Sequence, residues 1–524
     1  MSGKLPGEGD NMLSTVYCAG LFGIDGYIVT VECNSQNKIP VFELVGLPDL
    51  AVKEAKERVR TACENSGYRF PEMSLTLNLA PADRKKEGSA FDVPILLGIL
   101  RSGGILRQTV DFSGKCFVGE LSLSGELRAV KGALCMCVAA RDAGFSEFYV
   151  PCANAKEAAA VKGIKVFPVA NMRELVLHLN GEKPIAAIEH EVSDLLAAGG
   201  FHSLDFSDVR GQSMAKRAME IAAAGGHNIL LIGPPGTGKS MLAKRLPTIL
   251  PPLAFEEAIE TTKIHSVAGV LPENKSIVSE RAFRSPHHTM SAVSLVGGGA
   301  TPQPGEVSLS HNGVLFLDEL PEFPKLITDA LRQPIEDRKV TITRASGKVT
   351  FPCSFMLVAA MNPCRCGYFG HASRKCTCNE RDVKKYISRI SGPMLDRIDI
   401  QIELPSLGYD EIASKNKEEE TSETVRARVV AARRFASERF RGAGGIFCNA
   451  QLDAAEIRKY CIADDSAQAL LKSAYERMGM SVRGYDRIMR VARTIADLDG
   501  SEIINSRHIA EAIQYRSLDK KYWN

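Results

Sequence analysis

The sequence lacks long apolar runs and has almost no net charge, and each absence excludes a class of protein. The longest strongly apolar stretch, residues 93–100, is far shorter than the roughly 20 residues of a membrane-spanning helix. Residues 1–13 contain no apolar segment of the kind found in a secretory signal. Lys and Arg number 65 against 62 Asp and Glu, so the net charge is +3 and any contact with a polyanion must come from local basic patches. We therefore expect a cytoplasmic protein with no membrane partner.

The chain also lacks internal repeats and low-complexity tracts, and its 524 residues exceed what one hydrophobic core usually organises. Hydrophobic residues make up 45% and charged residues 24% of the sequence, which is typical of a globular chain. Alternating strand-like and helix-like segments predict an α/β domain over 1–180 and a second one over 205–410. We expect a linker over 181–204 between them and an all-helical domain over 411–524.

One segment carries the pattern of a phosphate-binding loop. An apolar strand (NILLI) runs into GPPGTGKS, residues 233–240, and a helix follows directly. The glycines permit a turn whose backbone N–H groups point at one anion, at the positive end of a helix. Lys239 can then reach the β- and γ-phosphates, and the Ser240 hydroxyl can ligate Mg²⁺. The predicted nucleotide-binding residues are Gly233, Pro234, Pro235, Gly236, Thr237, Gly238, Lys239 and Ser240.

Two further apolar strands end in polar residues that complete this chemistry. VLFLDEL, residues 314–320, contains Asp318 and Glu319, whose side chains should point different ways because side chains alternate along a strand. Asp318 is predicted to hold Mg²⁺ through water, and Glu319 to polarise the attacking water. FMLVAAMN, residues 355–362, ends in Asn362, whose amide is suited to orienting that water. Together these segments predict a nucleoside triphosphate hydrolase.

The motifs in this order resemble those of the AAA+ ATPases, and within them the magnesium-chelatase-like branch and its ComM/YifB family. The resemblance runs through the chain in the blocks FELVGLPD, APADRKKEGSAFDVP, FVGELSLSGELRAVKG, GPPGTGKS, FRSPHHTMS, GVLFLDELPEF, MNPCRCGY, LDRIDI and SVRGYDRIMRVARTIADLDG. It implies ATP and Mg²⁺ as cofactors and an α/β fold of three parts. These are an N-terminal ribosomal-S5-domain-2-like domain of the Lon and RadA type, an AAA+ P-loop ATPase core with a parallel sheet, and a C-terminal helical lid.

The resemblance also assigns two arginines and implies a ring. Arg397 occupies the position from which related ATPases present an arginine finger to the neighbouring subunit, where a guanidinium spreads positive charge over the γ-phosphate oxygens. From composition alone, the alternative for Arg397 is a surface salt bridge with Asp396 or Asp399. Arg483 matches the sensor-2 arginine of the lid. A site completed by a neighbour implies a homo-oligomer, and the family suggests a hexamer.

A basic hairpin is the first feature that points to DNA. Residues 336–351 (EDRKVTITRASGKVTF) alternate strand-like residues around a Ser-Gly turn, with no acid after position 338. In the family, an insertion at this place projects into the pore of the ring. Basic hairpin tips in a pore can grip phosphates, although an ordinary solvated hairpin fits the sequence equally well. The predicted DNA-binding residues are Arg338, Lys339, Arg344 and Lys348.

Other segments extend this expectation. Residues 374–397 contain seven Lys and Arg against three acids, which favours a surface that faces a polyanion. The glycine-rich segment 297–306 resembles a second insertion loop of the family. Arg487 and Arg490 are expected to be solvated or to face DNA, and the loop containing His287 and His288 to respond to the nucleotide.

Most of the 14 cysteines lie singly in apolar surroundings, as buried thiols do in a reducing compartment, but four are clustered. They form two C-x-C pairs separated by nine residues, within an insertion over 364–378 of the ATPase core. Such a set can surround one tetrahedral Zn²⁺ in a structural role, while an iron–sulfur cluster and four free thiols are the alternatives. The predicted metal ligands are Cys364, Cys366, Cys376 and Cys378.

The sequence thus predicts an ATP-hydrolysing, ring-shaped DNA motor of the helicase or branch-migration type, acting in homologous recombination or natural transformation. Its DNA partner would be single-stranded, duplex or branched. The alternatives are a magnesium-chelatase-type ATPase, a protein-remodelling AAA+ ATPase and an ATP-dependent protease. The protease is disfavoured because Leu134 stands where the resemblance to Lon requires the lysine that would activate Ser89.

Overall fold

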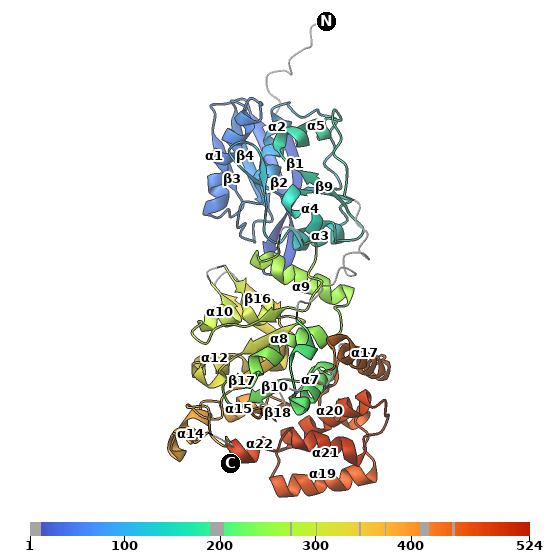
Figure 1. Ribbon diagram of the computed structural model, residues 1–524. Helices are drawn as coiled ribbons and strands as arrows, with labels where there is room; N and C mark the ends of the chain where they lie inside the picture. Colours follow the sequence, from blue (N-terminus) through green and yellow to red (C-terminus); the bar gives the residue numbers. More distant parts are fainter. Residues whose placement is uncertain are drawn as a thin grey trace.

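The computed structural model describes residues 12–188, 204–272, 275–299, 301–344, 347–371, 374–408, 419–442 and 446–523. Three parts are stacked along the molecule, with the N-terminal α/β part at one end, the second α/β part in the middle and the C-terminal helices at the other end (Figure 1). Most of the expected linker 181–204 and the first residues of the expected helical domain, 411–418, lie outside the described residues. No described helix is both long enough and apolar enough to cross a membrane.

The N-terminal part is built on a seven-stranded mixed sheet in the order β3-β4-β2-β1-β5-β8-β9. Its strands are β1 (Met12–Phe22), β2 (Asp25–Gln36), β3 (Phe42–Val45), β4 (Ser74–Ala80), β5 (Lys115–Phe117), β8 (Glu147–Pro151) and β9 (Lys165–Val169). In β2 the alternate residues Val29, Val31 and Cys33 are buried in one core with α1 (Leu50–Asn65) and α2 (Asp92–Ser102). Helix α3 (Ala133–Asp142) packs on the opposite face of the same strands.

The middle part contains a parallel five-stranded sheet in the order β11-β14-β17-β10-β18. Its strands are β10 (Ile229–Ile232), β11 (Phe283–Arg284), β14 (Val314–Leu317), β17 (Met356–Met361) and β18 (Ile400–Glu403). Every residue of β10, β14 and β17 is buried, as continuous apolar runs require when both faces of a parallel sheet are covered. Because parallel strands end at one edge, the residues that follow β10, β14 and β17 converge there.

The C-terminal helices share one apolar core with α7 (Ser213–Gly225) and α8 (Lys239–Ile249) of the middle part. They are α17 (Ser422–Arg439), α18 (Ala454–Tyr460), α19 (Asp465–Met478), α20 (Val482–Leu498) and α21 (Ser506–Gln514). The short α22 (Leu518–Tyr522) packs instead on the second core of the middle part, where Tyr522 is buried. Helix α20 is central, in contact with α7, α17 and α21. The expected fold class is confirmed: a mixed α/β N-terminal part, a parallel-sheet ATPase core and a C-terminal set of helices.

The N-terminal and middle parts are joined by a buried contact between α3 and α9 (Phe255–Ala268), which lies between them in Figure 1. The Ser266 hydroxyl donates to the buried Glu157 carboxylate, and the Gly132 N–H donates to the Ser266 carbonyl at 3.2 Å. Leu253 and Ala258 of the middle part are buried in the apolar cluster of the N-terminal part. The two parts therefore share a continuous core rather than a polar surface contact.

Candidate nucleotide site and neighbouring cysteine cluster

The phosphate-binding loop has the backbone that its glycines predict. Gly236 and Gly238 have φ values of +81° and +90°, a region that side chains with a Cβ rarely adopt. The loop passes directly into α8 at Lys239, so its N–H groups and the start of the helix lie together. This arrangement attracts an anion, because the unpaired N–H groups and the helix dipole are both positive there.

Lys239 is buried and donates to oxygens of its own surroundings. Its Nζ lies 2.7 Å from the Gly233 carbonyl oxygen, 2.9 Å from that of Pro234 and 3.1 Å from Asn362 Oδ1. Burial lowers the pKa of Lys239 to about 8, although the carboxylates of Asp318 and Glu319 favour its charged form. A phosphate that approached the loop would take over these donors and hold the charge on the amine.

Ser240 and Asp318 lie where the predicted magnesium ligands should lie. The Ser240 hydroxyl donates to Asp318 Oδ2 at 2.7 Å. One hydroxyl and one carboxylate oxygen beside the loop fit Mg²⁺, which takes few protein ligands and completes its shell with water and phosphate oxygens. When bound, the ion would neutralise charge on the β- and γ-phosphates.

Strand alternation does not set the direction of Glu319, because β14 ends at Leu317 and both acids follow it. The Glu319 backbone is in the left-handed region with φ +51°, and its N–H donates to Asp318 Oδ1 at 3.0 Å. The Glu319 side chain is exposed, and its Oε2 lies 3.9 Å from His288 Nδ1. His288 was not predicted as a contact of this carboxylate. The pairing of β11 with β14 explains this contact, because the residues that follow both strands reach the same edge of the sheet.

The predicted arginine finger and the predicted sensor-2 arginine have different surroundings. Arg397 is 12% exposed and forms an ion pair with Glu336 at 2.7 Å, rather than with Asp396 or Asp399. Its Nε also donates to the Arg332 carbonyl oxygen at 3.1 Å. Arg483 is exposed in the first turn of α20.

The expectation that Arg487 is solvated or faces DNA is wrong. Its side chain is 3% exposed, donates to the Leu395 carbonyl oxygen at 3.3 Å and pairs with Asp396 at 2.8 Å. Arg490 is half-buried, and its Nη1 donates to the Ala450 carbonyl oxygen at 3.3 Å. Both residues belong to α20, which is surrounded by other helices, so the aliphatic parts of their side chains are covered.

The predicted basic hairpin is confirmed as β15 (Lys339–Arg344) paired with β16 (Gly347–Pro352). Ser346 of the expected turn lies outside the described residues. One face, with Val340, Ile342, Val349 and Phe351, is buried in the core of the middle part. The other face is polar and solvent-exposed.

The four cations of the hairpin segment are not together. Lys339, Arg344 and Lys348 are exposed on the strands, and Arg344 Nε donates to the Gly299 carbonyl oxygen of the glycine-rich segment at 3.2 Å. Arg338 lies at the base of the hairpin and is half-buried. Burial lowers the pKa of Arg338, and the neighbouring Arg490 acts in the same direction.

The tip of the hairpin packs against the N-terminal part. A Cβ on Gly347 would lie 2.8 Å from Phe22 Cζ, and one on Gly23 would lie 2.4 Å from Val349 Cγ1. Thr301, in the glycine-rich segment, donates to Glu87 of the N-terminal part at 2.9 Å. The hairpin is therefore supported by the turn between β1 and β2.

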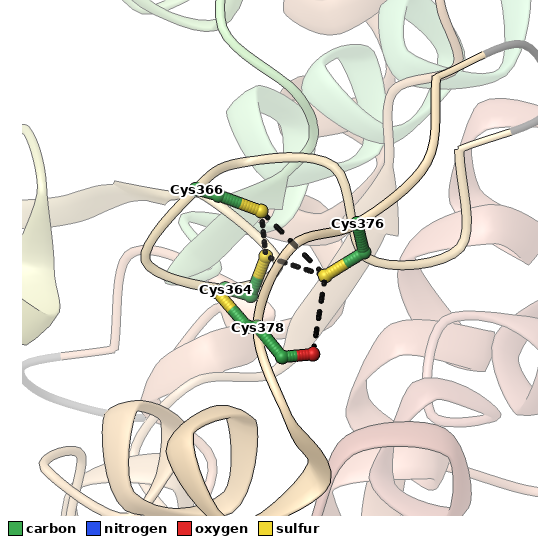
Figure 2. Close-up of side chains that lie close together, drawn as sticks. All are labelled: Cys364, Cys366, Cys376 and Cys378. Carbon is green, nitrogen blue, oxygen red and sulfur yellow. Dashed lines mark hydrogen bonds between the residues drawn. The ribbon is translucent and has the colours of Figure 1, made fainter.

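The four clustered cysteines meet in space, as the two C-x-C pairs predict (Figure 2). Sulfur–sulfur distances are 3.3 Å for Cys364–Cys366, 3.7 Å for Cys364–Cys376 and 3.5 Å for Cys366–Cys376. All four sulfurs lie within 4.8 Å of one another. A tetrahedron of Zn–S bonds near 2.3 Å requires sulfurs about 3.8 Å apart, so this cluster has the size of a Zn²⁺ site.

Thiolate character is favoured at Cys366 alone, because the pKa values of the other three thiols are raised, that of Cys364 mainly by burial. Burial raises the pKa of Cys366, but hydrogen bonds from the Thr377 and Tyr368 N–H groups outweigh it and bring the pKa to about 5. Such N–H donors around sulfur are the second layer of support that metal-binding thiolates need.

Comparison with known proteins shows the family of this chain. Family models described as magnesium chelatase subunit ChlI match residues 31–154, 205–412 and, for its C-terminal region, 419–516. Competence protein ComM of Haemophilus influenzae is 42% identical over 508 residues, covering 97% of this chain and 98% of the relative. The chain belongs to the ComM/YifB family of magnesium-chelatase-like AAA+ ATPases. YifB of Escherichia coli is 41% identical over 509 residues, with the same coverage.

Partial matches support the expected type of the N-terminal domain in this ComM/YifB-family chain. Lon protease 2 of Bacillus subtilis is 29% identical over 154 residues, 27% of this chain and 26% of the relative. The DNA repair protein RadA of the same organism is 34% identical over 90 residues, 17% of this chain and 19% of the relative. Here the Ser89 hydroxyl donates to the Glu120 carboxylate, and Leu134 is fully buried. Ser89 thus has a carboxylate partner instead of the lysine that a Ser–Lys dyad requires.

Proposed function

We propose that this ComM/YifB-family ATPase is a cytoplasmic, ring-forming motor that hydrolyses ATP to move along DNA during homologous recombination or natural transformation. The proposal rests on one observation: the exposed basic hairpin β15–β16 is followed within a few residues by β17, the strand directly before Asn362. A force on the hairpin therefore has a short covalent path to the nucleotide site.

Within this proposal each residue of the site has one task. The loop N–H groups and Lys239 bind the β- and γ-phosphates, while Ser240 and Asp318 hold Mg²⁺ directly or through water. Glu319 accepts a proton from the attacking water, which Asn362 orients. In a hexamer, Arg397 and Arg483 would reach the γ-phosphate across or beside the subunit boundary.

The role of Arg397 requires a change of partner. In the isolated chain its guanidinium is paired with Glu336, so it must leave this carboxylate before it reaches a neighbouring nucleotide. Assembly of the ring would supply the competing negative charge of the γ-phosphate.

We also propose that Cys364, Cys366, Cys376 and Cys378 hold one structural Zn²⁺. The support is the spacing of the four sulfurs and the N–H donors to Cys366. An iron–sulfur cluster is the alternative occupant, and its visible absorption would distinguish it from colourless zinc.

The test is ATP hydrolysis by the full chain with single-stranded DNA, duplex DNA and a four-way junction. The hairpin variant carries Arg344→Glu and Lys348→Glu, and the control carries Lys53→Glu on exposed α1 of the N-terminal part. We expect DNA to stimulate the native protein and the control, whereas the hairpin variant keeps only its basal rate. Stimulation that survives the double charge reversal would remove the hairpin from the DNA path.

Absence of stimulation by every DNA would contradict the motor proposal. A protein-remodelling ATPase would then predict stimulation by an unfolded protein, and a chelatase-type ATPase stimulation by a porphyrin. Both substrates therefore belong in the same experiment.

A further inference from the structure

The cysteine cluster lies directly against the phosphate-binding loop. Gly367, one residue after Cys366, approaches Pro235 so closely that a Cβ would lie 2.5 Å from Pro235 Cδ and 2.8 Å from Cγ. The Gly367 N–H donates to the Cys364 carbonyl oxygen at 3.0 Å, which closes a tight turn around the first pair of sulfurs. The position of this turn is therefore transmitted to the loop by direct contact.

A second connection runs through the chain itself. Cys364 follows Asn362 by two residues, and Pro363 and Cys364 are both buried. The Asn362 amide oxygen accepts the hydrogen bond from Lys239 at 3.1 Å. A displacement of the first cysteine would thus shift the amide that holds the phosphate-binding lysine.

The outer side of the cysteine loop is attached to the other wall of the nucleotide site. His371 Nε2 lies 2.8 Å from Ser406 Oγ. Two residues earlier, the Leu404 N–H donates to the Ile232 carbonyl oxygen at 2.7 Å, immediately before the phosphate-binding loop. The cluster also belongs to the apolar core that contains Ile232. The cysteine loop is therefore connected to Pro235, to Asn362 and to the segment after β18.

We propose that Zn²⁺ held by the four cysteines positions Pro235 and Asn362, so that metal occupancy sets the affinity for ATP. This rests on the proposed ATP and zinc binding. The metal displaces the thiol protons and replaces weak sulfur–sulfur contacts with four Zn–S bonds, which fixes the loop at its place against Pro235. Without the metal, the turn at Gly367 is joined to the second pair of cysteines by weaker contacts, such as Cys366–Cys376 at 3.5 Å and the N–H that Thr377 donates to Cys366.

The experiment measures zinc content and the dissociation constant of a fluorescent ATP analogue with Mg²⁺, on the full chain before and after removal of zinc by a chelator. We expect one zinc per chain and about tenfold weaker nucleotide binding after its removal, restored by adding zinc. Circular dichroism reports whether the stripped protein keeps its fold.

Two glycine variants separate positioning from folding. Gly367 and Gly370 both have positive φ, +86° and +75°, so Gly367→Ala and Gly370→Ala carry a similar backbone cost. Only at position 367 does the added methyl meet the phosphate-binding loop; at position 370 the nearest atom is Lys521 Nζ at 3.8 Å. We expect Gly367→Ala to keep its zinc and bind nucleotide about tenfold more weakly, and Gly370→Ala to match the native protein in both.

Each other outcome overturns a different statement. Unchanged affinity after zinc removal in a folded protein, or equal affinities of the two variants, would overturn the coupling. Failure to bind zinc would overturn the metal site. If the native, zinc-loaded protein binds no nucleotide, the proposed ATPase function is overturned. This result differs from those that overturn the coupling between zinc and nucleotide.

Discussion

At the scale of single residues, Lys239 combines a buried amine with oxygen partners from its own loop. Burial lowers its pKa to about 8, so the uncharged form gains as the pH rises above 8. Phosphate binds the charged form of Lys239. Above pH 8, the uncharged amine must therefore take up a proton when the nucleotide binds. We predict that affinity for the ATP analogue falls about tenfold between pH 7 and pH 9, since each pH unit above the pKa reduces the charged fraction about tenfold.

The matched variant is Lys239→Arg, whose guanidinium stays charged throughout this range. Its affinity should be lower overall because the longer side chain fits the buried site poorly, but flat with pH. A native protein with pH-independent affinity would show that Lys239 remains charged without nucleotide.

Glu319 supplies a second prediction at this scale. Glu319→Gln preserves shape but removes the base, so hydrolysis should slow by about a hundredfold or more while nucleotide binding persists. Single-turnover hydrolysis and analogue binding measure the two effects separately. His288→Ala removes the contact at 3.9 Å and should reduce turnover less than Glu319→Gln does. Equal binding losses in both variants would mean that this edge of the sheet holds the nucleotide rather than the water.

At the scale of elements, the features that could be predicted from the sequence are those set by residues close together along the chain. The phosphate-binding loop, the strand before Asp318 and the hairpin at β15–β16 were predictable because glycine conformation, continuous apolar runs and alternation are local signals. The four cysteines were also predictable, because short spacings limit where their sulfurs can lie. These agreements cover the elements but not every side chain within them.

The failures involve partners that are distant in sequence. Arg487 is buried rather than solvated, because α20 packs among α7, α17 and α21 and because Asp396, 91 residues earlier, pairs with it. The neighbours of Arg397 in sequence, Asp396 and Asp399, are not its partners in the fold, where it pairs with Glu336. Packing between elements decides such contacts, and no local pattern encodes it.

The hairpin gives a prediction for an element. Phe22 packs on the backbone of Gly347 at the tip, so Phe22→Ala should loosen the hairpin without touching the nucleotide site. We expect unchanged basal hydrolysis and DNA stimulation lower by a factor of about three, which corresponds to about 0.7 kcal/mol. Leu13→Ala, at another exposed side chain of β1, is the control. A basal rate that falls together with the stimulated rate would indicate a general loss of fold.

At the scale of the whole molecule, the proposed ring would make Arg397 act on a neighbour's nucleotide. Arg397→Ala should bind ATP but hydrolyse it at least about a thousandfold more slowly. Glu336→Gln removes only the partner within the chain and should leave hydrolysis near the native rate. If both variants lose activity equally, the ion pair itself is what hydrolysis requires.

Mixing two inactive variants tests the ring directly. A Lys239→Ala subunit still offers Arg397 to its neighbour, and an Arg397→Ala subunit still offers an intact phosphate-binding loop. Mixed rings should therefore recover part of the ATPase activity that neither variant has alone. No recovery, in a mixture shown by sedimentation to form hybrid rings, would place Arg397 in its own subunit's site.

The buried contact between α3 and α9 has a consequence for dividing the polypeptide into pieces. Leu253, Ala258 and Ile277 complete an apolar cluster whose other buried members come from the N-terminal part. A fragment ending near residue 188 would expose the apolar surface that Leu253 and Ala258 cover. The remaining fragment would expose those two side chains. Each fragment should aggregate when it is produced alone. When the two are co-expressed they should bind each other, so that a split protein reassembles without a covalent link.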